Sequence, residues 1–321
     1  MSRVIFFGPT PMSGIGQVCM TYCKLVHGDH IEYGQVPTKN YEVGFCFIIP
    51  VPQLIDVMKE YSKYCKKMVY MTVCETETVH PLYERLFELS DTFYTPSEFS
   101  SSRLKRQFPQ GNFPILRHYA HPCITNVSPI PEISELENKF VFYHIGNVID
   151  PRKNIKPIIE TFLRLQLPNS VLLLKATCNQ PVHWKIPGVV VLEGLMTKEH
   201  LEYIHKVGDC YVSFSHSEGA GMGAIEACMR NKMVILPEYG AGTEYIDTPY
   251  IIPCGTKKVG KDDFLFTKDM VWGDPDRNFL LKYMKDAYDK GKGALVVSQK
   301  THEIMGSVPP SFAKILFSNE Q

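Results

Sequence analysis

Short apolar runs alternate with amphipathic stretches along almost the whole sequence. This alternation is typical of βαβ units, in which buried parallel strands are connected by helices. The expected strands are residues 4–7, 43–49, 68–73, 92–96, 139–146, 171–177, 189–194, 209–215 and 233–237. Expected helices begin near Gly16, Pro52, Pro81, Ser97, Asn154, Thr197, Met222 and Pro275. The pattern predicts an α/β fold with doubly wound parallel sheets.

The alternation is interrupted once. Little apolar periodicity remains after residue 125, where Pro129 and Pro131 lie, and the pattern restarts at Lys139. The 321 residues are roughly twice a usual domain length, so two domains are expected. We predict a first domain over residues 1–127, a linker over 128–138 and a second domain over 139–295, with a C-terminal tail over 296–321 that packs back on the first domain.

Composition limits the function classes. Lys+Arg and Asp+Glu both number 34, which argues against a dedicated nucleic-acid binder. Ten cysteines without a Cys-x-x-Cys pair favour a reducing compartment. No segment approaches the ~20 apolar residues of a membrane helix, and the first apolar run is too short for a signal peptide. A cytoplasmic protein is expected, with no bound metal, because Asp274 and Asp276 fit a helix cap better than a metal site.

Residues 213–237 contain the side chains and glycines that point most directly to a ligand. A buried strand is expected to end at Ser215, and a glycine-rich loop then leads into a helix. Glycines at such a turn let backbone N–H groups approach a phosphate at the positive end of the helix dipole. Glu218 on the loop and Glu226 inside the helix can accept hydrogen bonds from sugar hydroxyls. Phosphates and hydroxyls together suggest a nucleotide sugar, although a turn of this kind is by itself more often structural.

Residues 218–226, Glu-Gly-Ala-Gly-Met-Gly-Ala-Ile-Glu, resemble the Glu-x7-Glu signature of retaining glycosyltransferases of family 4. Other segments resemble this family in the same order: 8–18, 90–104, 144–162, 189–215 and 240–246. The resemblance spans roughly residues 1–290. It implies the GT-B fold, two Rossmann-like domains that face each other across a cleft. The first domain would then take the acceptor and the second the nucleotide-sugar donor.

The resemblance implies a role for each matched residue. Glu226 matches the glutamate that binds the ribose hydroxyls, Glu218 the one that faces the transferred sugar, and Lys153 the lysine that neutralises the diphosphate. The base is expected beside residues 192–195. The implied catalytic residues are Glu218, Lys153 and Arg152, and the implied donor-binding residues are Gly14, Gly16, Asn147, Leu192, Gly219, Ala220, Gly221, Met222 and Glu226.

Two features depart from the family pattern or lie outside it. Asn147 stands where the family usually has arginine, so Arg152 either substitutes for that arginine or the diphosphate is held less tightly. On the acceptor side, the residues after the strand at 68–73 are candidates to orient a hydroxyl or take its proton, and solvated loop glutamates are an equal explanation. These acceptor-side candidates are Glu75, Glu77, His80 and His118.

The sequence therefore predicts a retaining, metal-independent glycosyltransferase without a cofactor. Its partners would be a UDP- or GDP-sugar donor and a glycan, glycoprotein or glycolipid acceptor, with peripheral membrane association left open. One alternative is a catalytically degenerate nucleotide-sugar-binding protein. Another is a nucleotide-sugar epimerase or hydrolase on the same fold. A dinucleotide dehydrogenase is disfavoured because residues 8–16 do not form Gly-x-Gly-x-x-Gly.

Overall fold

The computed structural model describes residues 3–10, 13–120, 123–125, 127–177, 180–194 and 196–318. Its contacts divide the chain into two compact units. Unit 1 comprises Met1–Ala120, Lys258–Val271 and Ile304–Gln321, and unit 2 comprises His121–Lys257 and Trp272–Glu303. The chain thus returns to unit 1 twice. The continuous domain bounds expected from the sequence, 1–127, 128–138, 139–295 and 296–321, stay a prediction.

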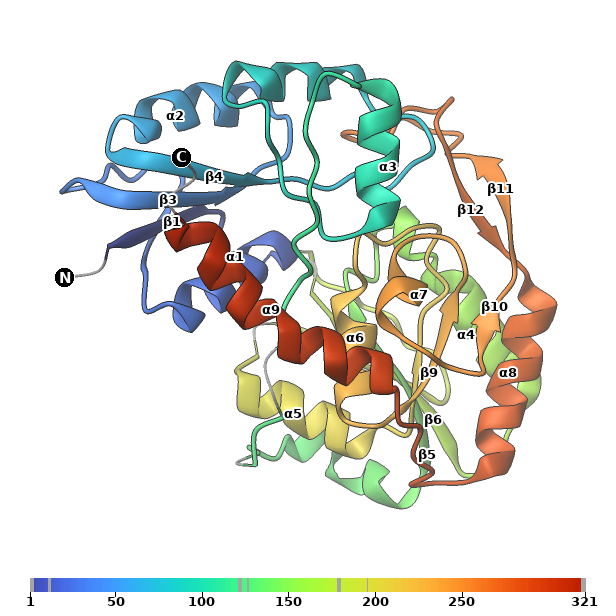
Figure 1. Ribbon diagram of the computed structural model, residues 1–321. Coiled ribbons are helices and arrows are strands. Elements are labelled where there is room, and N and C mark those ends of the chain that lie inside the picture. Colours follow the sequence, from blue (N-terminus) through green and yellow to red (C-terminus); the bar gives the residue numbers. More distant parts are fainter. Residues whose placement is uncertain are drawn as a thin grey trace. The chain divides into compact units, whose positions relative to one another are not determined.

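Unit 1 is built on a parallel sheet in the order β2-β1-β3-β4. The strands are β1 (Val4–Gly8), β2 (Asp29–Glu32), β3 (Tyr41–Phe47) and β4 (Cys65–Met71). Figure 1 shows α2 running along this sheet. The helices are α1 (Gly14–Leu25), α2 (Pro52–Ser62), the 3-10 helix η1 (Pro81–Glu88), α3 (Glu98–Gln107) and the last turns of α9 (Gln299–Phe317).

Unit 2 holds a six-stranded parallel sheet in the order β10-β9-β8-β5-β6-β7. Its strands are β5 (Phe140–Gly146), β6 (Ser170–Ala176), β7 (Val189–Leu192), β8 (Cys210–Val212), β9 (Met233–Pro237) and β10 (Ile251–Ile252). Its helices are η2 (Pro131–Asn138), η3 (Pro151–Lys153), α4 (Ile155–Leu165), α5 (Lys198–Val207), α6 (Met222–Met229), α7 (Gly242–Tyr245) and α8 (Arg277–Lys290). A two-stranded sheet joins β11 (Cys254–Lys258) to β12 (Val271–Pro275).

The two-residue period of the strands divides the unit 2 core between two faces. Phe142 and Leu174 point to one face of the sheet, where they pack with Ile158 of α4 and Leu280 of α8. Those two helices lie side by side in Figure 1. Tyr143, the next residue of β5, is fully buried on the opposite face. Both faces are covered, which explains why these strands read as continuous apolar runs.

Most of the expected elements form, and side chains cap three of the helix starts. The hydroxyls of Ser97 and Thr197 accept hydrogen bonds from backbone N–H groups three residues later, at 3.2 and 3.3 Å. The Asp276 carboxylate accepts one from the backbone of Asn278 at 2.7 Å, which confirms the expected cap.

Several local predictions are wrong. Residues 92–96 form isolated bridges rather than a strand, and the stretch after Pro81 is a 3-10 helix rather than an α-helix. Within residues 128–138, η2 forms and buries the Ile133 side chain, while the assignment of this segment as a linker stays a prediction. A helix does begin near Asn154, as expected, but the side chain of Asn154 does not cap it. Its left-handed backbone, with φ 51°, directs the side-chain amide to the carbonyl of Phe214 instead.

Candidate functional site

The candidate site is built on the turn between β8 and α6. Gly221 precedes α6 with φ 83°, a backbone conformation that residues other than glycine rarely adopt. Gly223, in the first turn, lies so close to β8 that an added Cβ would be 2.4 Å from the Tyr211 hydroxyl oxygen. The helix therefore begins directly beside the carboxyl end of the sheet. Its first N–H groups have no intrahelical acceptor, so this end can receive an anion.

Glu218 lies on this turn and forms an ion pair with two cations. Lys153 Nζ is 2.6 Å from Glu218 Oε1, and Arg152 Nη1 is 3.1 Å from Glu218 Oε2. The hydroxyl of Ser215 donates to Oε1 at 2.7 Å. Burial raises the pKa of Glu218, but the two cations lower it more, so the pKa lies well below its usual range. The carboxylate is therefore ionised at neutral pH.

Arg152 is held by hydrogen bonds within its own loop and to the loop after β8. In η3, the Asp150 carboxylate accepts from the backbone N–H of Arg152 at 2.9 Å and pairs with its guanidinium at 3.4 Å. The carbonyl of Arg152 accepts from the backbone N–H of His216 at 2.8 Å. These bonds hold the loop after β5 against the loop after β8. Two carboxylates and two cations meet there, so the cluster is formally neutral.

Glu226, on α6, has separate surroundings. Its carboxylate lies 3.8 Å from the Nε2 atom of His205 on α5. Burial raises the pKa of Glu226, but His205 and Arg230 lower it more, so the carboxylate is ionised at neutral pH. Its side chain is 30% exposed, whereas that of His205 is 2% exposed. A ligand can therefore reach Glu226 from one side while His205 covers the other.

The remaining donor-side candidates lie in three places. Gly219 and Ala220 lie in the turn before α6, and Met222 is the first residue of that helix. Asn147 forms a tight turn after β5, in which its carbonyl accepts from the backbone of Asp150, and Leu192 is buried at the end of β7. Leu195 lies outside the described residues. Gly14 and Gly16 belong to unit 1, at the start of α1, where Ser13 caps the helix.

Three of the four acceptor-side candidates contact neighbours within unit 1. Glu77 forms an ion pair with Arg103 at 2.7 Å, and the Nδ1 atom of His80 accepts from the backbone of Leu82 to cap η1. His118 is buried against Phe47, and burial lowers its pKa to about 3. Glu75 is half-buried in the loop after β4. These contacts give Glu77, His80 and His118 structural roles, and an acceptor role for any of the candidates stays a prediction.

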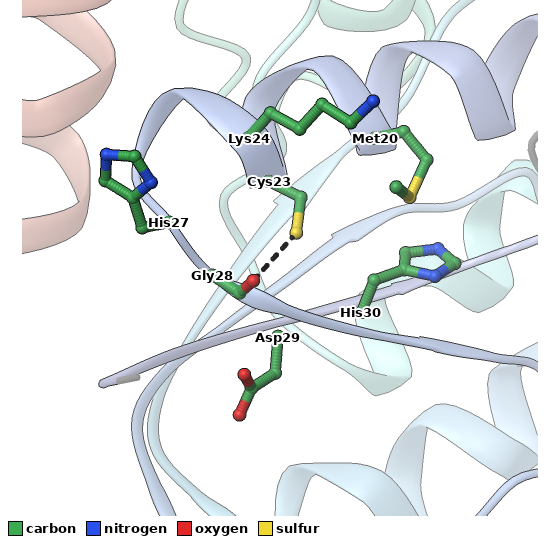
Figure 2. Close-up of a pocket in the computed structure, with 7 residues that line it drawn as sticks. All are labelled: Met20, Cys23, Lys24, His27, Gly28, Asp29 and His30. Atoms are coloured by element: carbon green, nitrogen blue, oxygen red, sulfur yellow. Dashed lines mark hydrogen bonds between the residues drawn. The ribbon is translucent and has the colours of Figure 1, made fainter. Parts of the chain in front are cut away.

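Unit 1 also has an open hollow, which lies at the opposite end of α1 from Gly14 and Gly16 (Figure 2). It is lined by residues from the C-terminal end of α1 and the start of β2, including Cys23, Lys24 and His30. Figure 2 shows the Cys23 thiol donating to the carbonyl of Gly28, at 3.2 Å. Ligands of open parallel sheets bind beyond the carboxyl ends of the strands. This hollow adjoins the amino end of β2, so it does not match the predicted donor loop.

Sequence reasoning missed four groups at the candidate site. Asp150 and Ser215 hold the charged cluster, while His205 and Tyr143 lie behind Glu226. The Asp150-Pro151 pair is a recognisable helix-start signal that could have indicated the first. The other three carry no local signal, because their roles depend on neighbours at least three residues away and, for His205 and Tyr143, on different elements. Within the described ranges, no three His, Cys, Asp or Glu side chains converge as metal ligands.

Comparison with solved structures identifies the fold. The chain resembles HepE of Anabaena in complex with UDP-glucose, with a TM-score of 0.65 and 12% identity over 98% of this chain and 99% of that one. A UDP-forming trehalose-phosphate synthase from Burkholderia xenovorans has a TM-score of 0.65 and 8% identity over 97% and 96%. The trehalose-6-phosphate synthase OtsA has a TM-score of 0.67 and 9% identity over 98% and 99%.

These likenesses confirm the predicted fold class, the GT-B fold with parallel-sheet α/β units. No protein-family model and no curated protein sequence matches the chain. The assignment to family 4 therefore stays a prediction. In the part of the chain that the structure describes, no helix is both long and apolar enough to cross a membrane.

Proposed function

We propose that this protein is a retaining glycosyltransferase that moves a sugar from a nucleotide diphosphate sugar to an acceptor hydroxyl. The observation that carries the proposal is the cluster of Arg152, Lys153 and Glu218 at the start of α6, in a chain with the GT-B fold. Two cations beside a helix N-terminus suit a diphosphate. The structure of HepE with UDP-glucose supports a UDP-sugar as donor, and a GDP-sugar is the other candidate.

In the proposed reaction, the glycosidic bond to the diphosphate breaks as the acceptor oxygen attacks the sugar carbon from the same face. Lys153 and Arg152 stabilise the charge that develops on the leaving phosphate, which is why a metal ion is not required. A phosphate oxygen of the leaving group takes the acceptor proton, so the protein supplies no nucleophile. Glu218 faces the sugar and Glu226 binds the ribose hydroxyls.

The acceptor is proposed to be a hydroxyl of a glycan or glycoconjugate. We propose that the reaction takes place in the cytoplasm. The buried free thiols of the chain suit a reducing compartment; they are Cys19, Cys46, Cys74, Cys210 and Cys228. A glycolipid acceptor would bring the protein to a membrane surface. Once the donor is known, a screen of candidate acceptors tests the proposed acceptor class.

A catalytically degenerate binding protein is the second candidate. Asn147 stands in place of the expected arginine, and Glu218 and Asp150 already neutralise the two cations. Such a protein would bind the donor and transfer nothing. An epimerase or hydrolase would instead consume the donor when no acceptor is present.

The test begins with thermal shifts against UDP- and GDP-sugars in EDTA, because a ligand that prefers the native state raises the midpoint. We expect one nucleotide class to raise it, and Glu226→Ala to remove most of that shift. Glu218→Ala should keep or strengthen nucleotide binding and reduce sugar transfer by about 100-fold or more, as expected for a group that acts mainly in the transition state. Wild-type-like behaviour of both variants would contradict the residue assignments, and no shift with any nucleotide would contradict the function.

A further inference from the structure

The buried side of Glu226 is covered by an aromatic pair that the proposed reaction does not use. His205 on α5 faces the Glu226 carboxylate, with 3.8 Å between Nε2 and Oε2. Behind it, the hydroxyl of Tyr143 on β5 lies 3.0 Å from His205 Nδ1, and the two rings meet edge to face. Both residues are almost completely buried. Tyr143, His205 and Glu226 thus lie in line from the core to a partly exposed carboxylate.

The direction of the hydrogen bonds follows from the chemistry of the three groups. Burial lowers the pKa of His205 and raises that of Tyr143, so both are neutral at neutral pH. If the phenol donates to Nδ1, Nε2 carries the imidazole proton and points it at the carboxylate. The opposite tautomer would set a nitrogen lone pair against a carboxylate oxygen, which is repulsive. Tyr143 therefore selects the tautomer that can donate to Glu226.

The neighbouring cation does not replace this donor. Arg230 donates through Nε to the carboxylate of Glu202 at 2.7 Å and through Nη1 to the backbone carbonyl of Glu226 at 2.7 Å. Neither bond reaches the Glu226 carboxylate. At 3.8 Å the His205 contact is longer than a hydrogen bond, and such bonds at ligand sites often tighten only when the ligand is present.

We propose that His205 is the positioning residue of Glu226, holding one carboxylate oxygen so that the other can accept from a ribose hydroxyl, and that Tyr143 fixes the imidazole for this task. The inference rests on the proposed function, in which Glu226 binds the ribose. It adds that discrimination for the ribose hydroxyls depends on two residues that do not touch the ligand. An immobilised acceptor discriminates better because less freedom is lost on binding.

The experiment measures the dissociation constants of UDP and of its 2′-deoxy and 3′-deoxy analogues by calorimetry. The readout is the ratio of deoxy to ribo constants. A packing defect weakens all three ligands alike and leaves the ratio unchanged. GDP and its deoxy analogues are run in the same way, because the base is not yet identified.

We expect the wild-type ratio to fall by about 3- to 10-fold in His205→Phe, equivalent to about 0.7 to 1.4 kcal/mol. Tyr143→Phe should give a smaller fall. His205→Gln, which keeps an N–H donor, should recover part of the ratio. Glu226→Ala should bring the ratio close to one, and His205→Phe should change it no further in that background.

Two outcomes separate the failure of this inference from the failure of the proposed function. Wild-type protein that binds UDP or GDP with ribose discrimination, together with an unchanged ratio in His205→Phe and Tyr143→Phe, would overturn the role of His205 alone. Wild-type protein that binds neither nucleotide would overturn the donor site itself. If His205→Phe does not fold, Tyr143→Phe and His205→Gln carry the same test.

Discussion

At the scale of single residues, Glu218 competes with the ligand that the site is proposed to bind. Its carboxylate pairs with both Arg152 and Lys153, and Asp150 adds a second negative charge. A diphosphate must take over those cations before it can bind. In the proposed reaction, Glu218 would then turn from the two cations to the transferred sugar.

Replacing Glu218 with glutamine should therefore strengthen anion binding. Glu218→Gln keeps the shape of the side chain and removes one negative charge, leaving the cluster with a net positive charge. We expect inorganic pyrophosphate to bind about 3- to 10-fold more tightly, measured by calorimetry at low ionic strength, because less charge opposes it. Glu132→Gln, an exposed change elsewhere in unit 2, is the control. Weaker pyrophosphate binding in Glu218→Gln would contradict this competition.

At the scale of elements, helix starts are placed by close backbone approaches that only glycine permits. An added Cβ at Gly16 would be 2.1 Å from the carbonyl oxygen of Thr10, whereas one at Gly14 would meet nothing within 4 Å. Both glycines belong to the first turn of α1, and their resemblance to a donor loop did not distinguish them. Packing distinguishes the two glycines, because the helix backbone at Gly16 lies directly against the preceding loop, whereas the position of Gly14 is open.

Alanine at these two positions should have different effects. Gly16→Ala forces the helix start away from residue 10 and should lower the free energy of unfolding by about 1 to 3 kcal/mol, the usual cost of overpacking. Gly14→Ala is its matched control and should change that free energy by less than about 1 kcal/mol. Urea unfolding followed by circular dichroism measures both. Equal losses in the two variants would show that backbone approach is not what fixes this turn.

At the scale of the whole molecule, the chain returns to unit 1 after it has built most of unit 2. The last turns of α9 supply Phe312, which is fully buried against the first sheet. Its ring centroid lies 4.3 Å from that of Tyr22 and 5.5 Å from that of Phe45. The core of unit 1 is therefore incomplete without a helix from the far end of the sequence.

Removing the ring of Phe312 should destabilise unit 1. Phe312→Ala leaves a cavity between α1 and the sheet, and we expect a loss of about 3 to 5 kcal/mol in the free energy of unfolding. Phe317→Ala, on the same helix but 47% exposed, should cost less than about 1 kcal/mol. Urea titrations of the two variants give the comparison. A similar loss for both would mean that α9 contributes through helix formation rather than through this contact.

The fold class and the main donor-side turn could be predicted from the sequence. Buried parallel strands require apolar runs, and closely spaced glycines mark the turn into α6, so both leave a local pattern. The half-buried edge strand β2 and the helix α9 have no such local pattern in the sequence. Residues 29–32 include three polar side chains, and Pro309 and Pro310 argue against a helix that forms all the same. Packing outweighed local propensity in both cases.

By itself, the sequence determined the parallel α/β architecture, the start of α6 and the positions of Glu218 and Glu226 along the chain. Only the tertiary structure decided that Glu218 pairs with Arg152 and Lys153, that Glu226 faces His205, and that the C-terminal segment forms a helix. The physical reason is range. Strand and turn patterns arise from neighbours a few residues apart, whereas ion pairs and core contacts join residues about 20 to 300 positions apart.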